Sequence, residues 1–208
     1  MFHPFDEIPT TIKNSELIIK RRQEIANAAL KIFSQKGYYN TTIRDIAKEV
    51  NLGIGGIYAY ISTKEDILRI IFDNYLHKLL EELEAVDSSL SHTDNLINKC
   101  RKFFSMNEKN AETIRLMYSE LRFVQKDLIY YLFDYSNRII QVFEKIIILG
   151  QQNGEFNRNI DPRTVAFDIM TFGNMWCFYK SFFKGKSWEE YSNSHINNIL
   201  ILLGANRS

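Results

Sequence analysis

Residues that interrupt helices are scarce in this chain. Only 3 of the 208 residues are proline and 9 are glycine. Proline removes a backbone donor and glycine is entropically costly inside a helix, so both residues disfavour helix interiors. Aromatic residues are plentiful by contrast, with 15 phenylalanines and 11 tyrosines, and sustained strand-like alternation is missing. The composition therefore predicts an all-α protein with a bulky, aromatic interior.

Cysteines and long apolar runs are also few. The 2 cysteines, Cys100 and Cys177, lie far apart and outside any Cys/His cluster, which favours two buried thiols over a metal site. Apolar runs such as 146–149 are far too short to span a bilayer. Residues 1–10 mix prolines and acids instead of forming the apolar core of a signal peptide. We therefore expect a cytoplasmic protein with no membrane partner.

Motifs that carry catalytic chemistry are missing as well. The chain has no HExxH pattern, no GxSxG elbow and no phosphate-binding loop. Its 4 histidines are scattered, which favours surface or capping roles for them: His3, His77, His92 and His195. We therefore expect that the protein is not an enzyme and that it binds neither a metal ion nor a cofactor.

Net charge is close to neutral, at +1, whereas a non-specific nucleic-acid binder is normally far more basic. The distribution of charge is more informative. Between residues 13 and 48 only Glu16, Glu24 and Asp45 oppose a larger set of bases: Lys13, Lys20, Arg21, Arg22, Lys31, Lys36, Arg44 and Lys48. This local positive excess is typical of a segment that approaches nucleic acid.

The same segment has the pattern of a helix-turn-helix. After an irregular arm over residues 1–14, expected to be mobile, apolar spacing predicts helices at 15–37, 43–50 and 54–61. The second and third of these helices are joined by Asn51-Leu52-Gly53, a short turn containing glycine. Ser62 and Glu65 suggest a capping box for a longer helix that ends near Glu84.

Candidate phosphate contacts surround this turn. Thr42 stands at a helix N-terminus, where its hydroxyl and the backbone N–H groups suit an anion. Tyr58 and Tyr60 offer phenols, and Lys64 offers an ammonium at the start of the next helix. Helix capping by Thr42 and core packing by Tyr58 are the alternative roles.

The stretch ALKIFSQKGYYNTTIRDIAKEVNLGIGGIYAYISTKEDIL resembles the DNA-binding domain of the TetR/AcrR family of repressors. Matching features are Phe33 with Gly37, Thr42, Ile46-Ala47, Gly55, Ile57-Tyr58, Tyr60 and residues 62–65. The resemblance implies a homodimer of all-helical subunits, each with a three-helix DNA-binding domain and a C-terminal ligand-binding and dimerisation domain. It also implies ligand-released repression at a palindromic operator.

The recognition helix departs from a usual reading surface. Residues 53–60 contain no Arg, Lys, Asn or Gln, so the common bidentate base contacts are missing there. We expect apolar contact from Ile54 with thymine methyl groups, close backbone approach at Gly55 and Gly56, and a polar base contact from Arg44. These features predict an A/T-rich operator read partly through DNA shape. A helical interaction module that has lost specific DNA binding remains the alternative.

We place the two domains at 15–62 and 63–208. Helices in the second domain are expected at 93–106, 109–122, 125–150, 162–184 and 187–204. The family resemblance places an effector pocket among the middle helices, and large adaptable side chains suit a fatty acyl or aromatic effector. The candidate lining residues are Phe104, Met117, Tyr118, Phe172 and Trp176. Core packing is the alternative role for each of them.

The last two expected helices carry more apolar side chains than one domain requires. The resemblance assigns these helices to the homodimer interface, which a palindromic operator would match. The candidate interface residues are Phe178, Phe182, Trp188, Ile196, Ile199 and Leu203. Packing within a single chain is the alternative for this set.

Overall fold

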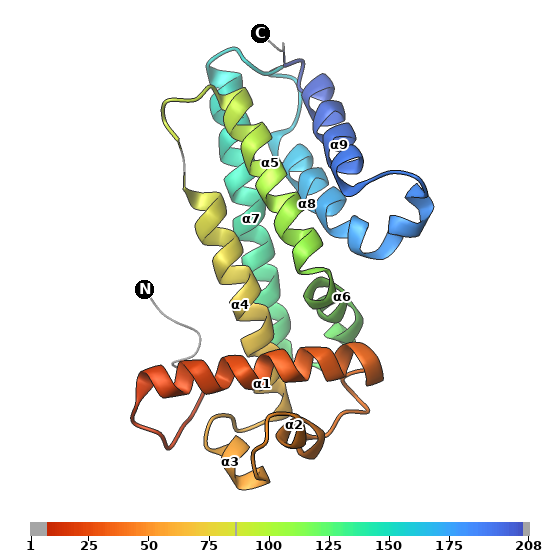
Figure 1. Ribbon diagram of the computed structural model, residues 1–208. Coiled ribbons are helices and arrows are strands. Elements are labelled where there is room, and N and C mark those ends of the chain that lie inside the picture. Colours follow the sequence, from red (N-terminus) through yellow and green to blue (C-terminus); the bar gives the residue numbers. More distant parts are fainter. Residues whose placement is uncertain (1–7, 86, 206–208) are drawn as a thin grey trace. The chain divides into compact units, whose positions relative to one another are not determined.

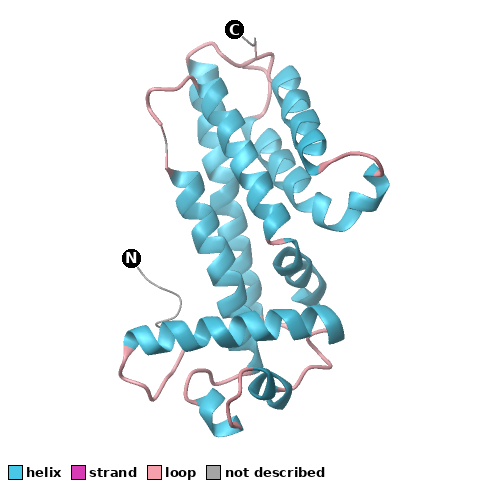
Figure 2. Ribbon diagram, in the orientation of Figure 1, coloured by secondary structure: helices cyan, strands magenta, loops and turns pink. Residues whose placement is uncertain are grey.

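The structure is a computed structural model that describes residues 8–85 and 87–205. Every regular element in this part of the chain is helical, and the helices follow one another as drawn in Figures 1 and 2. The prediction of an all-α protein is confirmed. Half of the predicted irregular arm, residues 1–7, lies outside the described residues, and residues 8–14 are described below.

The N-terminal helices begin and end at local signals. Helix α1 (Ser15–Lys36) starts where the Asn14 side chain accepts a hydrogen bond from the Leu17 N–H. It ends at Gly37, whose φ of +80° is readily adopted by glycine. One face of α1 is buried and includes Ile25, Ala29 and Phe33. These are the three- and four-residue spacings that predicted the helix.

Helices α2 (Ile43–Glu49) and α3 (Ile54–Tyr58) form the helix-turn-helix. In the turn, Asn51 adopts a φ of +53°, a conformation that Asn tolerates better than most residues. The Leu52 N–H then donates to the Ala47 carbonyl at 2.9 Å. Helix α2 contacts both α1 and α3, and Figure 1 shows α2 and α3 on the same side of α1.

Helix α4 (Lys64–Glu84) is capped by Thr63, one residue after the predicted cap. The Asp66 carboxylate accepts hydrogen bonds from the Ser62 and Thr63 N–H groups, and the Asp66 N–H donates to the Thr63 hydroxyl. The capping pair is therefore Thr63 and Asp66, and the prediction of Ser62 with Glu65 was wrong. Both arrangements have the same spacing, so the sequence does not distinguish them.

The later helices lie close to their predicted ranges. They are α5 (His92–Lys109), α6 (Ala111–Glu120), α7 (Lys126–Gln152), α8 (Pro162–Tyr179) and α9 (Trp188–Leu202), with short 3₁₀ turns η2 (Leu121–Phe123) and η3 (Lys180–Phe183). The predicted helix 162–184 thus becomes α8 followed by η3. Asp161 caps α8 through the Thr164 N–H, and Pro162 occupies its first turn, where proline is well tolerated.

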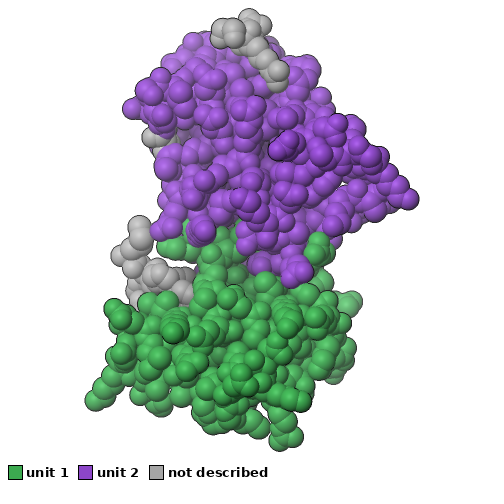
Figure 3. Space-filling model, in the orientation of Figure 1, with its two compact units in different colours: residues 1–77, 115–129 green, residues 78–114, 130–208 purple. Residues whose placement is uncertain are grey.

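The chain divides into two compact units, coloured separately in Figure 3. Unit 1 comprises residues up to 77 together with 115–129, and unit 2 comprises 78–114 and 130 onward. In unit 1 the connection before α7 contacts α4 and the turn before α2: the Gln125 N–H donates to the Glu65 carboxylate, and the Phe123 and Tyr39 ring centroids lie 6.0 Å apart. These units differ from the ranges 15–62 and 63–208, which were drawn from helix pattern instead of compactness.

The interior of unit 2 is aromatic, as the composition predicts. Phe103 on α5 packs edge-on against Phe143 on α7, with ring centroids 5.7 Å apart. Helix α8 comes close to α5 at Gly173, where an added Cβ would lie 2.5 Å from the Phe103 ring and 2.8 Å from the Phe104 ring. Glycine at position 173 therefore sets the distance between these two helices.

Neither a membrane span nor a metal cluster is found in the part of the chain that the structure describes. None of its helices combines the length and the apolar character needed to cross a bilayer. Its His, Cys, Asp and Glu side chains do not gather in groups of three or more that suit a metal ion. Cys100 and Cys177 are both buried as free thiols, and burial raises the pKa of the Cys100 thiol.

Candidate DNA-binding face and effector region

The outer face of α3 is short, open and free of charge. Ile54 and Tyr58 are exposed at 41% and 49%, while Ile57 on the opposite face is fully buried. A Cβ added at Gly55 would have no neighbour within 4 Å, and one at Gly56 would meet only Leu52. The face predicted for base contact is thus the face that the fold leaves exposed, and nothing at Gly55 blocks approach to the helix backbone.

Helix α2 begins with a complete capping box at Thr42 and Asp45. The Asp45 N–H donates to the Thr42 hydroxyl at 3.2 Å, and the Asp45 carboxylate accepts from the Thr42 N–H at 2.9 Å. The hydrogen bonds that the carboxylate accepts from the Thr42 N–H and hydroxyl lower the pKa of the Asp45 carboxyl, and Lys36 lies 3.4 Å from it. Thr42 therefore caps α2, and a phosphate there would have to share its hydroxyl with Asp45.

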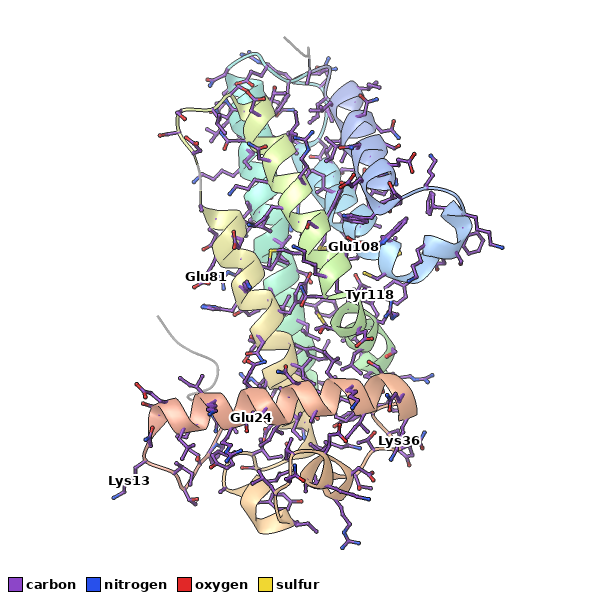
Figure 4. The ribbon with its side chains drawn as sticks, viewed as in Figure 1. Lys13, Glu24, Lys36, Glu81, Glu108 and Tyr118 are labelled. Atoms are coloured by element: carbon purple, nitrogen blue, oxygen red, sulfur yellow. The ribbon has the colours of Figure 1, made fainter. Side chains whose placement is uncertain are left out.

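Arg44 is exposed in the first turn of α2. Lys48 is exposed in the last turn of the same helix, while Lys31 on α1 is held by Glu49 at 2.8 Å. Figure 4 shows Lys13 and Lys36 near the two ends of α1. The basic residues predicted to meet nucleic acid are therefore spread along unit 1, with Arg44 and Lys48 on the helix that leads into the turn.

Tyr60 and Lys64 are placed differently from the other candidates. The Tyr60 residue is only 8% exposed. The Lys64 ammonium donates to the carbonyls of Tyr38 at 2.8 Å and Thr41 at 2.9 Å, and lies 4.2 Å from the centroid of the Tyr38 ring. Partial burial lowers the pKa of Lys64. Their phosphate contacts stay predictions, and the geometry favours support of the turn before α2.

Arg22 was grouped by sequence with the bases that face nucleic acid, but its side chain is 2% exposed. The guanidinium donates through Nε to the Tyr60 carbonyl at 2.9 Å and through Nη2 to the Ile8 carbonyl at 2.7 Å. Its position on α1 offered a signal for this role, because Arg22 lies three residues before Ile25 and shares the buried face.

Three of the candidate effector residues lie in one aromatic cluster of unit 2. The cluster is formed by Phe104, Phe172, Trp176, Phe183, Trp188, Tyr191 and His195, whose rings have neighbouring centroids 4.3–6.2 Å apart. Phe104 is fully buried and Trp176 is 8% exposed. Burial lowers the pKa of His195, which stacks on Phe172. The remaining candidates, Met117 and Tyr118, belong to unit 1, and Tyr118 is exposed on α6 (Figure 4).

Unit 2 also has a groove that sequence reasoning missed. It has a volume of about 590 Å³ and lies beside α5 and α7, where Leu90, Val142, Ile146 and Leu149 supply apolar walls. Arg138 and Lys145 stand in the same lining, and Arg138 pairs with Glu84 at 3.2 Å. Its lining comes from residues 84–95 and 138–149, so no continuous pattern in the sequence marks it.

The candidate dimer residues divide by exposure. Ile196, Ile199 and Leu203 are at most 4% exposed and pack inside unit 2, and Trp188 belongs to the aromatic cluster. Phe182 is 81% exposed, and Phe178 is partly exposed. Other apolar side chains on α8 and α9 that remain open are Phe167, Tyr179, Ile201 and Leu202. These exposed residues, and not the buried ones, offer apolar surface to a second subunit.

Two family models match the chain. Residues 25–71, from the middle of α1 into α4, match the model described as bacterial regulatory proteins, tetR family. Residues 93–183, from α5 to the end of η3, match the model described as Tetracyclin repressor-like, C-terminal domain. The two matches together cover the helix-turn-helix and most of the aromatic cluster.

Similar proteins are found along most of the chain. The HTH-type transcriptional regulator HbdR of Aromatoleum sp. (strain CIB) is 27% identical over 172 residues, which are 82% of this chain and 75% of HbdR. The fatty acid metabolism regulator protein of Bacillus subtilis (strain 168) is 25% identical over 141 residues, 67% of this chain and 73% of that protein.

Solved structures share the fold. A bacterial regulatory protein in the tetR family from Rhodococcus RHA1 superposes with a TM-score of 0.81 at 24% identity, covering 90% of this chain and 99% of that one. The transcriptional regulator FadR from Bacillus subtilis, solved in complex with stearoyl-CoA, has a TM-score of 0.70 at 20% identity, covering 86% of this chain and 98% of that one.

Proposed function

Because this chain belongs to the tetR family of bacterial regulatory proteins, we propose that it is a homodimeric, ligand-responsive transcriptional repressor. Unit 1 binds a palindromic DNA operator, and an apolar small molecule with a fatty acyl or aromatic group binds unit 2 and releases the DNA. A protein that acts on chromosomal DNA works in the cytoplasm, and no catalytic step is required of it.

The observation that carries this proposal is the exposed, uncharged face of α3 beside the capped N-terminus of α2. Ile54 and Gly55 lie on an exposed surface without polar side chains, which suits close approach to the major groove. Tyr58 on α3, and Thr42 and Arg44 at the start of α2, are also exposed. On such a surface, contacts with phosphates provide most of the affinity. Contacts with thymine methyl groups and with the shape of the groove provide the sequence specificity.

The proposed DNA contacts therefore differ in kind. Thr42 and Tyr58 bind phosphates, Ile54, Gly55 and Gly56 approach the bases, and Arg44 supplies a polar base contact. Tyr60 and Lys64 support the DNA-binding helices without touching DNA. The Tyr60 residue is buried, and the Lys64 ammonium donates to two carbonyls of the turn before α2.

Two features support an acyl or aromatic effector. The aromatic cluster of unit 2 consists of large, apolar rings that can separate around a ligand, and Phe104, Phe172 and Trp176 belong to it. The similar proteins add to this, since one is a fatty acid metabolism regulator and a structural neighbour holds stearoyl-CoA. Met117 and Tyr118 belong to unit 1, so the proposed effector site in unit 2 uses Phe104, Phe172 and Trp176.

The proposed dimer uses exposed apolar side chains of α8, η3 and α9. Phe182, which is 81% exposed, and Ile201, which is 69% exposed, are the most exposed large apolar residues of these elements. Burying such side chains against a second copy is favourable by about 25 cal/mol for each Å² removed from water. A C2 dimer would also match the symmetry of a palindromic operator.

The test is DNA selection followed by competition with effectors. The wild-type protein is used to select duplexes from a random-sequence pool, and binding is measured by fluorescence anisotropy against salt. We expect an A/T-rich palindrome, a binding constant that falls steeply with salt, and about tenfold weaker binding by Arg44→Ala. Long-chain acyl-CoA and aromatic carboxylates are then added, and one class is expected to release the duplex.

Two results would contradict the proposal. Failure to select any duplex at low salt would favour an interaction module without specific DNA binding. Selection of a G/C-rich site without thymines in its half-sites would refute the reading attributed to Ile54 and Gly55.

A further inference from the structure

The recognition helix is too short to hold its own position. Helix α3 spans Ile54–Tyr58, includes Gly55 and Gly56, and begins at Gly53 without a side-chain cap. Isolated helices of fewer than about 12 residues are marginal in water, and glycine weakens them further. Contacts with the rest of unit 1 must therefore fix the direction in which α3 points.

Within α3, Ile57 is fully buried and anchors the helix. At its C-terminal end it has no basic residue in the last turn to satisfy the carbonyls that follow. The carbonyls of Ala59 and Tyr60, the two residues directly after α3, are instead satisfied by side chains from elsewhere in the sequence.

One of these donors comes from residues 8–14, here called the strap. The Thr10 hydroxyl donates to the Ala59 carbonyl at 2.7 Å, across 49 positions of sequence. The same hydroxyl oxygen accepts from the Ile12 N–H at 3.2 Å, which orients it. Ile8 is buried at 4% exposure, so the strap is anchored in the core and is not the mobile arm that the sequence suggested.

The other donor is Arg22 of α1. Its guanidinium bridges the Ile8 carbonyl of the strap and the Tyr60 carbonyl after α3, at 2.7 and 2.9 Å, in a site where the side chain is 2% exposed. A buried guanidinium that donates to two carbonyls cannot shift without leaving a charge and two acceptors unsatisfied, which is costly. Arg22 thus joins the strap and the end of α3 into one rigid connection.

We propose that Thr10 and Arg22 are positioning residues for the recognition helix, so that operator affinity depends on a strap that does not itself need to touch the DNA. This inference rests on the proposed function of unit 1 and deepens it. The strap sets the position of α3, and α3 sets the fit of Ile54, Gly55 and Tyr58 to the groove.

The test is Thr10→Val, which keeps the shape of the side chain and removes the donor to Ala59. The rescue variant is Thr10→Ser, and the matched control is Thr11→Val, a neighbouring exposed threonine. Two duplexes are used as probes: the best one selected by the wild-type protein, and the same duplex with scrambled half-sites. Hydrogen exchange of the segment 53–61 is followed in the absence of DNA.

We expect Thr10→Val to raise the dissociation constant for the selected duplex by about fivefold, the loss typical of one hydrogen bond. Binding to the scrambled duplex at low salt should not change, because phosphate attraction does not depend on the direction of α3. Exchange in 53–61 should become faster, while Thr10→Ser and Thr11→Val should behave like the wild type.

Unchanged affinity and unchanged exchange in Thr10→Val would overturn the proposal. An equal loss of affinity for both duplexes would also overturn it, because that result indicates less folded protein and not a misplaced helix. If the wild-type protein selects no duplex, the proposed function fails, and the exchange measurement alone still decides whether the strap orders α3.

Discussion

Replacing Glu155 by glutamine should destabilise unit 2 near neutral pH and have almost no effect in acid. Glu155 lies between α7 and α8, and its carboxylate accepts four hydrogen bonds at the N-terminus of α5. The donors are the His92 N–H at 3.0 Å, the His92 ring at 2.7 Å, and the Thr93 N–H and hydroxyl, both at 2.9 Å. A neutral amide has only one accepting oxygen, so some of these donors would lose their partner.

The pKa of Glu155 gives the size of the effect. Burial alone would raise this pKa, but the hydrogen bonds from Thr93 and His92 outweigh it and lower the value from 4.5 to about 2. At about 1.4 kcal/mol for each pH unit the full difference is about 3.4 kcal/mol. Because the side chain is 25% exposed, solvent screening reduces this to about 2 kcal/mol. For a chain of this size that is a fall of about 4–8 °C in Tm.

The pH dependence follows from the direction of the pKa. A carboxyl whose pKa is lower in the folded state stabilises the fold fully above its unfolded pKa and loses that contribution as pH falls towards the folded pKa. The wild type should therefore exceed Glu155→Gln in Tm near neutral pH, and the difference should shrink below about pH 4.5 and nearly vanish near pH 2.

Thermal unfolding followed by circular dichroism, at several pH values, measures this difference. The control is Glu108→Gln, an exposed carboxylate on α5 whose replacement should change stability by less than about 0.5 kcal/mol. A difference between wild type and Glu155→Gln that stays the same from neutral to acidic pH would refute the reasoning, since the charge of the carboxylate would not be its source.

Two further predictions concern packing and the turn before α2. Gly173→Ala should lower the free energy of unfolding by about 2 kcal/mol, because the new methyl group would lie 2.5 Å from the Phe103 ring; urea unfolding measures this, and an unchanged midpoint would contradict it. Lys64→Met should lower the free energy of unfolding by about 1–2 kcal/mol, because the hydrogen bonds to the two carbonyls are lost. The salt dependence of DNA binding should not change. A salt slope reduced by about one would instead identify Lys64 as a phosphate contact.

The contact between α4 and the connection before α7 was not visible in the sequence. Glu65 was expected to cap α4, but its carboxylate accepts the Gln125 N–H, across 60 positions. Desolvation raises the pKa of this carboxyl. Residues 115–129 form part of unit 1 through contacts of this kind, although they lie far from its other residues in sequence.

Local signals made most of the helices predictable. Asn14, Thr42, Asp161 and Ser187 cap their helices through bonds to residues only three positions away, and Gly37 ends α1 through its own conformation. The family resemblance rested on the same kind of contiguous residues. For such elements, the residues that decide the structure all lie within one or two turns of each other.

By itself, the sequence determined the all-α class, the helix order and the exposed glycine-rich face at Ile54 and Gly55. Only the tertiary structure decided the direction of the long side chains. Arg22 and Lys64 were expected to face nucleic acid; Arg22 donates to buried carbonyls and Lys64 to partly buried ones, 14 to 38 positions away. A flexible cationic side chain can reach solvent or a nearby carbonyl from the same backbone position, so the choice depends on which carbonyls the fold brings within reach.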